Sequence, residues 1–242
     1  MTDTVLAIAL KSLHHDMARL EQVAHNLGNV ATPGYKRQAL ASGSFSRAFD
    51  SAGGPPPTPR IASDLRAGTL QITNQPLDLA LTGDGFFEVM TPHGPAYTRS
   101  GRFAVDAQGR LATAEGHAVM GRDGEIRLEG RAPSIDAAGH VTEVRVEGAP
   151  PVSVGRIKVV GFERPQELTR LGSTLFGPDP RAGTASDAEV RMRQGALENA
   201  NVNSAREMVE LMQTMRHFEG MHRIVQGYDE MLGGAVRKLA EA

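Results

Sequence analysis

Apolar residues recur at alternating spacings of four and three near both ends of this chain, and this repeat limits its possible folds more than any other feature. Near the N-terminus the repeat consists of Leu6, Leu10, Leu13, Met17, Leu20, Ala24 and Leu27. After Asn201 it returns as Met208, Leu211, Met215, Phe218, His222, Val225, Asp229, Leu232, Val236 and Leu239. Such spacing is typical of a helix that packs through one narrow apolar seam. The sequence therefore predicts a long helix at each end of the chain.

The first predicted helix ends in the segment NLGNVATPGYKR, residues 26–37. Gly28 and Asn29 tolerate the left-handed backbone that ends many helices, and Pro33 disfavours a helical conformation at the residue before it. We therefore expect a helix end followed by a sharp turn. This segment carries no chemistry by itself.

The C-terminal helix is predicted to have a wider apolar face than the first. A second apolar track beside its seam consists of Met221, Ile224, Tyr228, Met231 and Ala235. A helix with two adjacent tracks can contact several neighbours. One such helix buries too little apolar area alone to offset the entropy of ordering it. We expect both terminal helices to become ordered when several chains assemble around them.

Between the two helices the period of the apolar residues changes to two. The segment LDLALTGDGFFEVM, residues 77–90, reads as two strands joined by a Gly-Asp-Gly turn and predicts a β-hairpin. The segments at 103–113 and 133–143 share the order apolar, Asp, two spacers, Gly, one residue, apolar, which predicts two further hairpins. The predicted fold class is mixed α and β, with N- and C-terminal helices that form a coiled-coil-like layer and a central antiparallel all-β domain.

A Gly- and Pro-rich stretch, SAGGPPPTPR at 51–60, precedes this β region. Three consecutive prolines favour an extended, semi-rigid conformation, so the stretch is expected to be an arm or linker. The predicted parts are a helix with its exit turn at 1–35, an extended arm at 36–69, the β domain at 70–194 and the C-terminal helix at 195–242.

Composition excludes several classes of protein. A net charge of −2 and the lack of a long basic block argue against nucleic-acid binding. The absence of cysteine excludes disulfides and thiolate metal sites. The apolar run from Val5 to Leu10 is shorter than a usual signal-peptide core, and no window has the length of a membrane-spanning helix, so we expect neither a cleaved signal peptide nor membrane insertion.

No arrangement typical of a catalytic, cofactor or metal site stands out. His14 and His15 are adjacent on a helix and do not share a face, and His217 and His222 are five residues apart, which is poor spacing for joint chelation. Asp84 and Glu88 are a carboxylate pair of the kind that any β-rich chain contains. We expect no enzyme activity. A hydrolase, or a monomeric binding module with a helical clamp, is the alternative from another class.

The segment NLGNVATPGYKR resembles the N-terminal signature of the bacterial flagellar rod and hook proteins. Further segments resemble the family in the same order: PLDLALTGDGFFEV, YTRSGRFAVDAQGRLATAEGHAVMG, LGSTLF and VRMRQGALENANVNSAREMVELMQTMRHFE. The resemblance implies a structural subunit of the periplasm-spanning rod, which transmits motor torque. It also implies terminal helices packed in an inner coiled-coil layer, partners that are other rod subunits and copies of the same chain, and export by the flagellar type III apparatus.

Within that family, chain length and the MRHFE motif resemble the proximal rod proteins of the FlgF type, and we expect this subtype. The motifs TPGYKR and NVNSAREMVELMQT suit a distal rod protein of the FlgG type equally well. One departure from the family pattern is Val30-Ala31, where a second Asn-rich dipeptide is usual.

The expected assembly interface combines both seams with the exit turn. It consists of Leu6, Leu10, Leu13, Met17, Leu20, Leu27, Asn26, Asn29, Pro33, Gly34, Tyr35, Met208, Leu211, Met215, Phe218, Val225, Leu232, Val236 and Leu239. Pro33 and Gly34 are expected to turn the chain out of the helical layer. Tyr35 is expected to pack on a neighbouring subunit, while Asn26 and Asn29 satisfy exposed groups at the helix end.

Overall fold

The computed structural model describes residues 2–41, 60–145, 149–183, 185–188 and 190–240. The chain divides into two compact units. The helical unit comprises Met1–Gly28, Gln38–Ala62 and Asn203–Ala242, and the β unit comprises Asn29–Arg37 and Ser63–Val202.

The helices are α1 (Thr2–Gly28) and α3 (Ser204–Ala240), with short 3-10 helices η1 (Pro165–Glu167) and η2 (Pro180–Ala182). The strands are β1 (Gln38–Ala41), β2 (Arg60–Ser63), β3 (Leu70–Ile72), β4 (Leu79–Thr82), β5 (Phe86–Thr91), β6 (Gly94–Thr98), β7 (Phe103–Val105), β8 (Leu111–Thr113), β9 (Ala118–Gly121), β10 (Gly124–Glu125), β11 (Arg131–Ile135), β12 (His140–Val144), β13 (Val152–Arg156), β14 (Val159–Gly161), β15 (Thr169–Arg170), β16 (Leu175–Gly177), β17 (Ser186–Asp187), β18 (Arg191–Gln194) and β19 (Ala196–Glu198). The prediction of one long helix near each end is confirmed.

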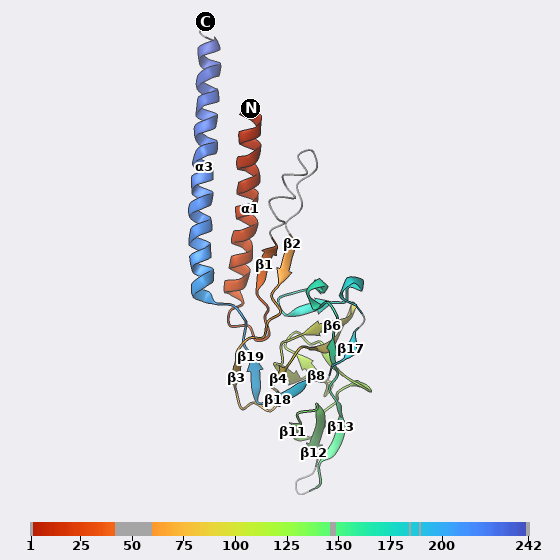
Figure 1. Ribbon diagram of the computed structural model, residues 1–242. Coiled ribbons are helices and arrows are strands. Elements are labelled where there is room, and N and C mark those ends of the chain that lie inside the picture. The colour runs from red at the N-terminus through yellow and green to blue at the C-terminus, as the bar shows by residue number, and fades with distance from the viewer. Residues whose placement is uncertain (1, 42–59, 146–148, 184, 189, 241–242) are drawn as a thin grey trace. The chain divides into compact units, whose positions relative to one another are not determined.

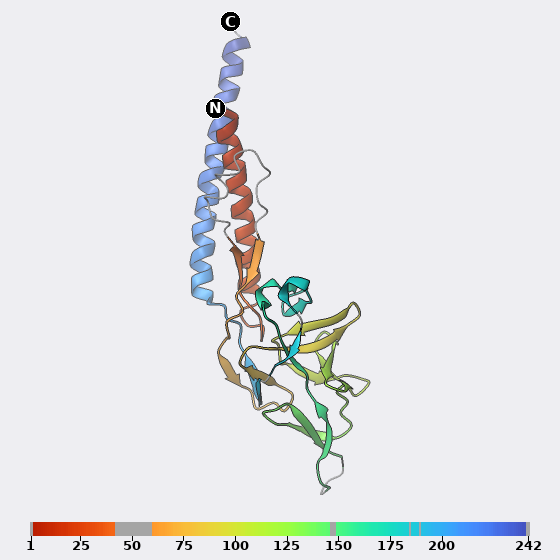
Figure 2. The same cartoon turned by 45° about the vertical axis from the view of Figure 1, so that its right-hand side comes forward.

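In the helical unit, α1 and α3 lie side by side and run in opposite directions (Figures 1 and 2). Contacts between Asn26 and Glu207, and between Asp16 and His217, show the antiparallel order. Asn203 caps the start of α3, because its side-chain oxygen accepts a hydrogen bond from the backbone N–H of Arg206 at 3.0 Å. α3 has 37 residues and α1 has 27, so part of α3 has no counterpart in α1.

The helices pack through a different face of α1 than the seam predicts. Ala9, Asp16 and Val23 are buried, and their spacing of seven residues places them on one face. The contact of Asp16 with His217 identifies this face as the one toward α3. Leu10 and Met17 of the predicted seam remain 45% and 56% exposed. The contact within one chain therefore buries Ala9, Asp16 and Val23, half-buries Leu13 and Leu20, and leaves Leu10 and Met17 exposed.

Within the predicted arm at 36–69, the described residues include the strands β1 and β2. β1 and β2 pair with each other as a two-stranded sheet, and β1 contacts α1. Polar side chains of α1 explain this contact, because the amide of Asn26 both donates to the carbonyl of Gln38 at 3.0 Å and accepts from its N–H at 2.9 Å. Of the Pro-rich stretch, residues 51–59 lie outside the described part of the chain.

The β unit is built around one ten-stranded sheet, in the order β15-β16-β6-β5-β9-β8-β7, with β10 on β9, and with β14 on β5 and β17. Smaller sheets are formed by β11-β12-β13, by β18 with β4 and by β19 with β3. Every one of these pairs is antiparallel. The prediction of a central antiparallel β domain is confirmed.

β5 is buried on both of its faces. Its consecutive residues Phe86 and Phe87 point to opposite sides, as alternation along a strand requires. Phe87 packs edge-on against Phe103, with ring centroids 5.1 Å apart, and Phe86 packs against Phe176 at 5.7 Å. The two phenylalanines therefore belong to two separate apolar cores, one on each side of the main sheet.

Two of the three predicted hairpins are confirmed, since β7 pairs with β8 and β11 pairs with β12. In both turns the glycine has a positive φ, 76° at Gly109 and 85° at Gly139. The hairpin predicted at 77–90 is wrong, because β4 pairs with β18, and β5 pairs with β6, β9 and β14. The local pattern cannot show that β18, more than 100 residues later in the chain, pairs with β4.

The division of the chain also differs from the predicted boundaries. The helical region ends at Gly28, and the exit turn 29–37 belongs to the β unit. Residues 196–198 form β19 of the β unit, so the C-terminal helical part begins at 203 rather than 195. Both differences arise because the segments next to the helices form hydrogen bonds with β-unit strands and loops.

Candidate functional site

Eight large apolar side chains of α1 and α3 are exposed. They are Leu10 at 45%, Met17 at 56%, Met208 at 55%, Val209 at 48%, Met212 at 53%, Met215 at 48%, Ile224 at 53% and Met231 at 67%. Met208, Met212 and Met215 follow one another at spacings of four and three, so they share one face of α3. Ile224 and Met231 belong to the second predicted track. α3 therefore exposes apolar side chains on more than one face.

The remaining seam residues fall into two groups. The half-buried ones are Leu13, Leu20, Leu27, Leu211, Phe218 and Val225. The side chains of Leu6, Leu232, Val236 and Leu239 lie outside those that the structure describes.

Polar contacts connect α1 to α3. The ring Nδ1 of His217 lies 2.6 Å from a carboxylate oxygen of Asp16, and Arg19 Nε donates to Glu210 at 2.9 Å. Asn26 is fully buried and donates to Glu207 at 3.0 Å. The expectation that Asn26 satisfies exposed helix-end groups is therefore wrong, because its amide lies between α3 and β1.

The exit turn is a compact structure within the β unit. The carbonyl of Asn29 accepts a hydrogen bond from the N–H of Thr32 at 3.0 Å, and the carbonyl of Thr32 accepts one from Tyr35 at 3.2 Å. Asn29 thus supports the turn itself. Gly34 has φ +70°, and a Cβ there would lie 2.2 Å from the backbone nitrogen of Ser100. Only glycine fits this position.

Tyr35 packs inside its own chain. Its side chain is 1% exposed, and the guanidinium carbon of Arg170 lies 5.1 Å from the centre of its ring. Arg170 also lies 5.1 Å from the ring centre of Phe176, which extends this contact to the second apolar core. The expectation that Tyr35 packs on a neighbouring subunit is wrong, because this ring has almost no surface left to offer.

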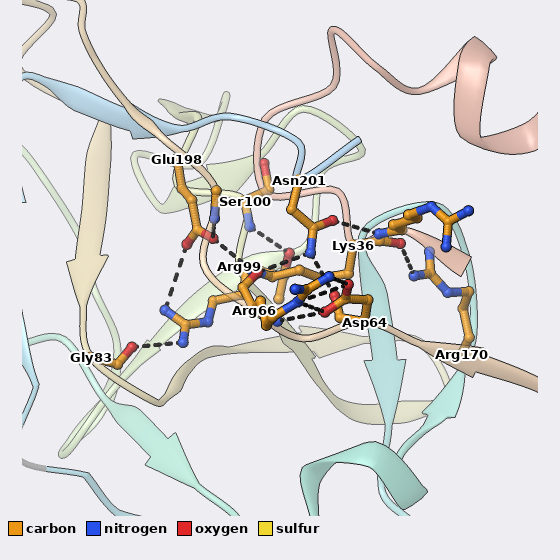
Figure 3. Close-up of polar contacts among 12 residues, drawn as sticks. Lys36, Asp64, Arg66, Gly83, Arg99, Ser100, Arg170, Glu198 and Asn201 are labelled. Atoms are coloured by element: carbon orange, nitrogen blue, oxygen red, sulfur yellow. Dashed lines mark hydrogen bonds and ion pairs between the residues drawn. The ribbon is translucent and has the colours of Figure 1, made fainter. Parts of the chain in front are cut away.

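A buried polar cluster lies next to the exit turn (Figure 3). Lys36, 1% exposed, donates from Nζ to Glu198 Oε1 at 2.6 Å and to the carbonyl of Arg66 at 2.8 Å. Glu198 Oε1 also accepts from the N–H of Gly68 at 2.9 Å. Arg99 Nη1 lies 3.6 Å from Glu198 Oε2. We call this cluster, with Asn201 and Arg170, the polar junction.

Asn201 links the backbone of two segments at the same place (Figure 3). Its side-chain oxygen accepts from the N–H of Arg37 at 2.7 Å, and its Nδ2 donates to the carbonyls of Asp64 at 2.7 Å and Arg66 at 2.9 Å. Arg170 donates to the carbonyl of Lys36 at 2.6 Å. The polar junction thus connects the exit turn, the segment after β2 and the segment after β19.

Two buried cations share the single carboxylate of Glu198. Burial lowers the pKa of Lys36, and the neighbouring Glu198 carboxylate opposes that shift. Burial likewise lowers the pKa of Arg99, whose Nη2 donates to the carbonyl of Gly83 at 2.7 Å. Removing one partner from such a cluster leaves a buried charge uncompensated and destabilises the fold strongly.

The sequence-based interpretation missed the polar junction. Lys36 and Glu198 are far apart in the sequence, and each one, viewed within its own segment, looks like an exposed surface charge. One signal was present: Glu198 lies in GALEN, where a charged residue directly follows the apolar pair of a short strand. Among the described residues, no group of three His, Cys, Asp or Glu side chains could hold a metal ion. Across the same residues, none of the helices combines the length and apolarity needed to cross a membrane.

Two family models match this chain. The model described as "Flagellar hook protein FlgE/F/G D1 domain" matches residues 80–145, and the one described as "Flagellar basal body rod FlgEFG protein C-terminal" matches residues 193–237. The first match lies in the β unit. The second runs from β18 into α3, and it includes Glu198 and the exposed methionines.

Similar proteins match over nearly their whole length. The flagellar basal-body rod protein FlgG of Bacillus subtilis is 30% identical, with 92% of this chain and 94% of the relative covered. FlgF of Salmonella typhimurium and FlgF of Escherichia coli are each 30% identical, with 98% of this chain and 99% of the relative covered. These relatives are structural proteins rather than enzymes. The chain belongs to the family of flagellar basal-body rod proteins.

Proposed function

We propose that this rod protein polymerises through its terminal helices, which pack with neighbouring subunits in a coiled-coil-like inner layer. The observation that carries this proposal is the exposure of eight large apolar side chains on α1 and α3. The neighbours are other rod subunits and copies of this chain. The seam residues Leu10, Met17, Met208 and Met215 form part of the interface between them.

The exposed side chains supply a substantial driving force. Full burial of one such side chain stabilises by about 1.5–3 kcal/mol, so covering the exposed half of eight of them contributes roughly 6–12 kcal/mol. Part of this is offset by the lost freedom of the associating chains. Because the apolar residues lie on more than one face of α3, this helix can contact more than one neighbour.

We propose the proximal rod as the location of the subunit. The MRHFE motif and the chain length support it, while relatives of the FlgF and FlgG types share the same 30% identity. The distal rod is the alternative. Export by the flagellar type III apparatus is part of the same proposal.

The proposal is tested by replacing apolar residues of α3 with aspartate in the full-length protein. Met208→Asp combined with Met215→Asp is expected to abolish rod assembly and motility, because the carboxylates cannot be buried between helices. The matched control is Gln213→Asp combined with Gln226→Asp, which adds the same two negative charges at exposed polar positions of the same helix. Normal rods in the methionine variant, or equal loss in both variants, would contradict an apolar interface.

The contacts of Asp16 and Arg19 with α3 favour a second candidate, a self-contained module in which the helices pair within one chain. In that case the methionine variant would leave the function intact. Hydrogen exchange of the dilute monomer separates the two candidates, because a self-contained pair would protect its amides at any concentration.

A further inference from the structure

The chain passes between its two units at four places, and three of the crossing segments meet in the polar junction. The exit turn precedes β1, the residues after β2 return from the helical unit, and the residues after β19 precede α3. Hydrogen bonds within the β unit connect all three segments. This arrangement concentrates the contacts of distant segments on a few side chains.

Glu198 contacts both the exit turn and the segment after β2 (Figure 3). Its carbonyl accepts from the N–H of Gly34 at 2.7 Å, and its carboxylate accepts from Lys36 and from the N–H of Gly68. The side chain is 1% exposed. A buried carboxylate of this kind depends on each of its donors, since a missing donor leaves charge without compensation.

We propose that the ion pair of Glu198 with Lys36 is a latch that couples the docking of the exit turn to that of the segment returning from β2. Glu198 acts as a positioning residue for both segments. Loss of the ion pair loosens both segments together, while the hydrogen bonds of Asn201 to Arg37, Asp64 and Arg66 remain. The inference concerns a single chain and does not depend on the proposed polymerisation.

The separation of the partners in the sequence gives the latch a consequence for folding. Lys36 and Glu198 are 162 residues apart, and Arg37 and Asn201 are 164 apart. The N–H of Asp64 donates to the carbonyl of Arg37 at 2.7 Å, so this segment adds to the same set of contacts. Contacts over such separations form late because closing long loops has an entropic cost.

The competing explanation is that Tyr35 alone anchors the exit turn through Arg170. That contact holds the aromatic ring but makes no link to Gly68. Under this explanation, loss of the Lys36–Glu198 pair leaves the segment at 66–68 packed in the polar junction. The two explanations therefore differ in whether two segments open together.

Peptide-resolved hydrogen exchange of the full-length protein tests the latch. Glu198→Gln and Lys36→Met are each expected to accelerate exchange at Gly34, Arg37 and Gly68 by on the order of tenfold or more. The hairpin at 103–113 is expected to keep its exchange rate. In the double variant the acceleration should be smaller than the product of the two single effects, because both substitutions remove the same interaction.

Asp187→Asn is the matched control, because it removes an exposed ion pair with Arg122 at 3.0 Å in the same unit. It should change none of these rates. Acceleration at the exit turn without acceleration at Gly68, or multiplicative effects in the double variant, would overturn the latch. If Glu198→Gln also opens the hairpin, Glu198→Asp, which keeps the charge, replaces it. For Glu198→Asp, a smaller acceleration of exchange at both the exit turn and Gly68 supports the latch. Faster exchange in only one of these two segments overturns it.

Discussion

The β unit and the helical unit bury different kinds of side chain. In the β unit, Phe86 and Phe87 fill two apolar cores, and the buried charges of Lys36 and Glu198 are paired with each other. In the helical unit, the contact between helices buries Ala9, Asp16 and Val23, while larger apolar residues remain exposed. A periodic apolar pattern thus indicates which face of a helix packs against another element. It does not show whether that element belongs to the same chain or to a neighbouring subunit.

The largest expected effect is the loss of the exit-turn geometry in the β unit. Gly34→Ala should destabilise the unit by more than about 4 kcal/mol, because the added Cβ would meet backbone atoms of Arg99 and Ser100. Urea unfolding followed by circular dichroism measures this. Gly116→Ala is the control: its φ of +84° is close to that of Gly34, but nothing lies within 4 Å of an added Cβ, so a loss of about 1–2 kcal/mol is expected. Equal losses would show that steric contact at Gly34 is unimportant.

A smaller effect is expected from Arg170→Ala, at about 3 kcal/mol, since it removes contacts with two buried rings and a hydrogen bond to the carbonyl of Lys36. Arg122→Ala, which removes only an exposed ion pair, should cost less than about 1 kcal/mol. The same urea experiment compares them. A loss at Arg170 as small as that at Arg122 would mean that the aromatic contacts contribute little.

Within the helical unit, buried and exposed residues of α1 are expected to respond differently to truncation. Val23→Ala should cost about 2 kcal/mol of helical-unit stability, because Val23 is 1% exposed. Met17→Ala should cost less than about 0.5 kcal/mol, because that side chain is more than half exposed. Thermal unfolding followed at the helical signal provides the measurement. If Met17→Ala were the more destabilising of the two, the assignment of inner and outer faces would be wrong.

The smallest expected effect is on the pH dependence of the β unit. Hydrogen bonds from Arg181 lower the pKa of Asp179, and hydrogen bonds from His140 lower the pKa of Asp136. Because the folded-state pKa lies below the unfolded value, this stabilisation is present at neutral pH and is lost as pH falls through the acidic range. Urea midpoints between neutral and acidic pH should therefore decline. Asp179→Asn should make the urea midpoint less dependent on pH. An unchanged pH dependence in that variant would show that ionised Asp179 does not stabilise the β unit.

The terminal helices and the hairpins around Gly109 and Gly139 could be predicted because their signals are local. Helix spacing, capping and turn residues act over a few positions. The pairing of β4 with β18 could not be predicted, because strands of similar pattern compete for the same edge. The polar junction was missed for a related reason: Lys36 and Glu198 each look like surface charges until the fold brings them together. The sequence pattern placed Tyr35 against a neighbouring subunit because its partner Arg170 is also far away in the sequence.

Hydrogen exchange of the purified full-length monomer, measured over a series of protein concentrations, tests the central difference between the units most directly. The account predicts that β5 and β6 are protected at every concentration, while amides of α1 and α3 exchange faster than those of β5 in dilute solution and become more strongly protected on assembly. Protection of α1 and α3 equal to that of β5 in dilute solution would contradict it, since the helical unit would then be complete in one chain.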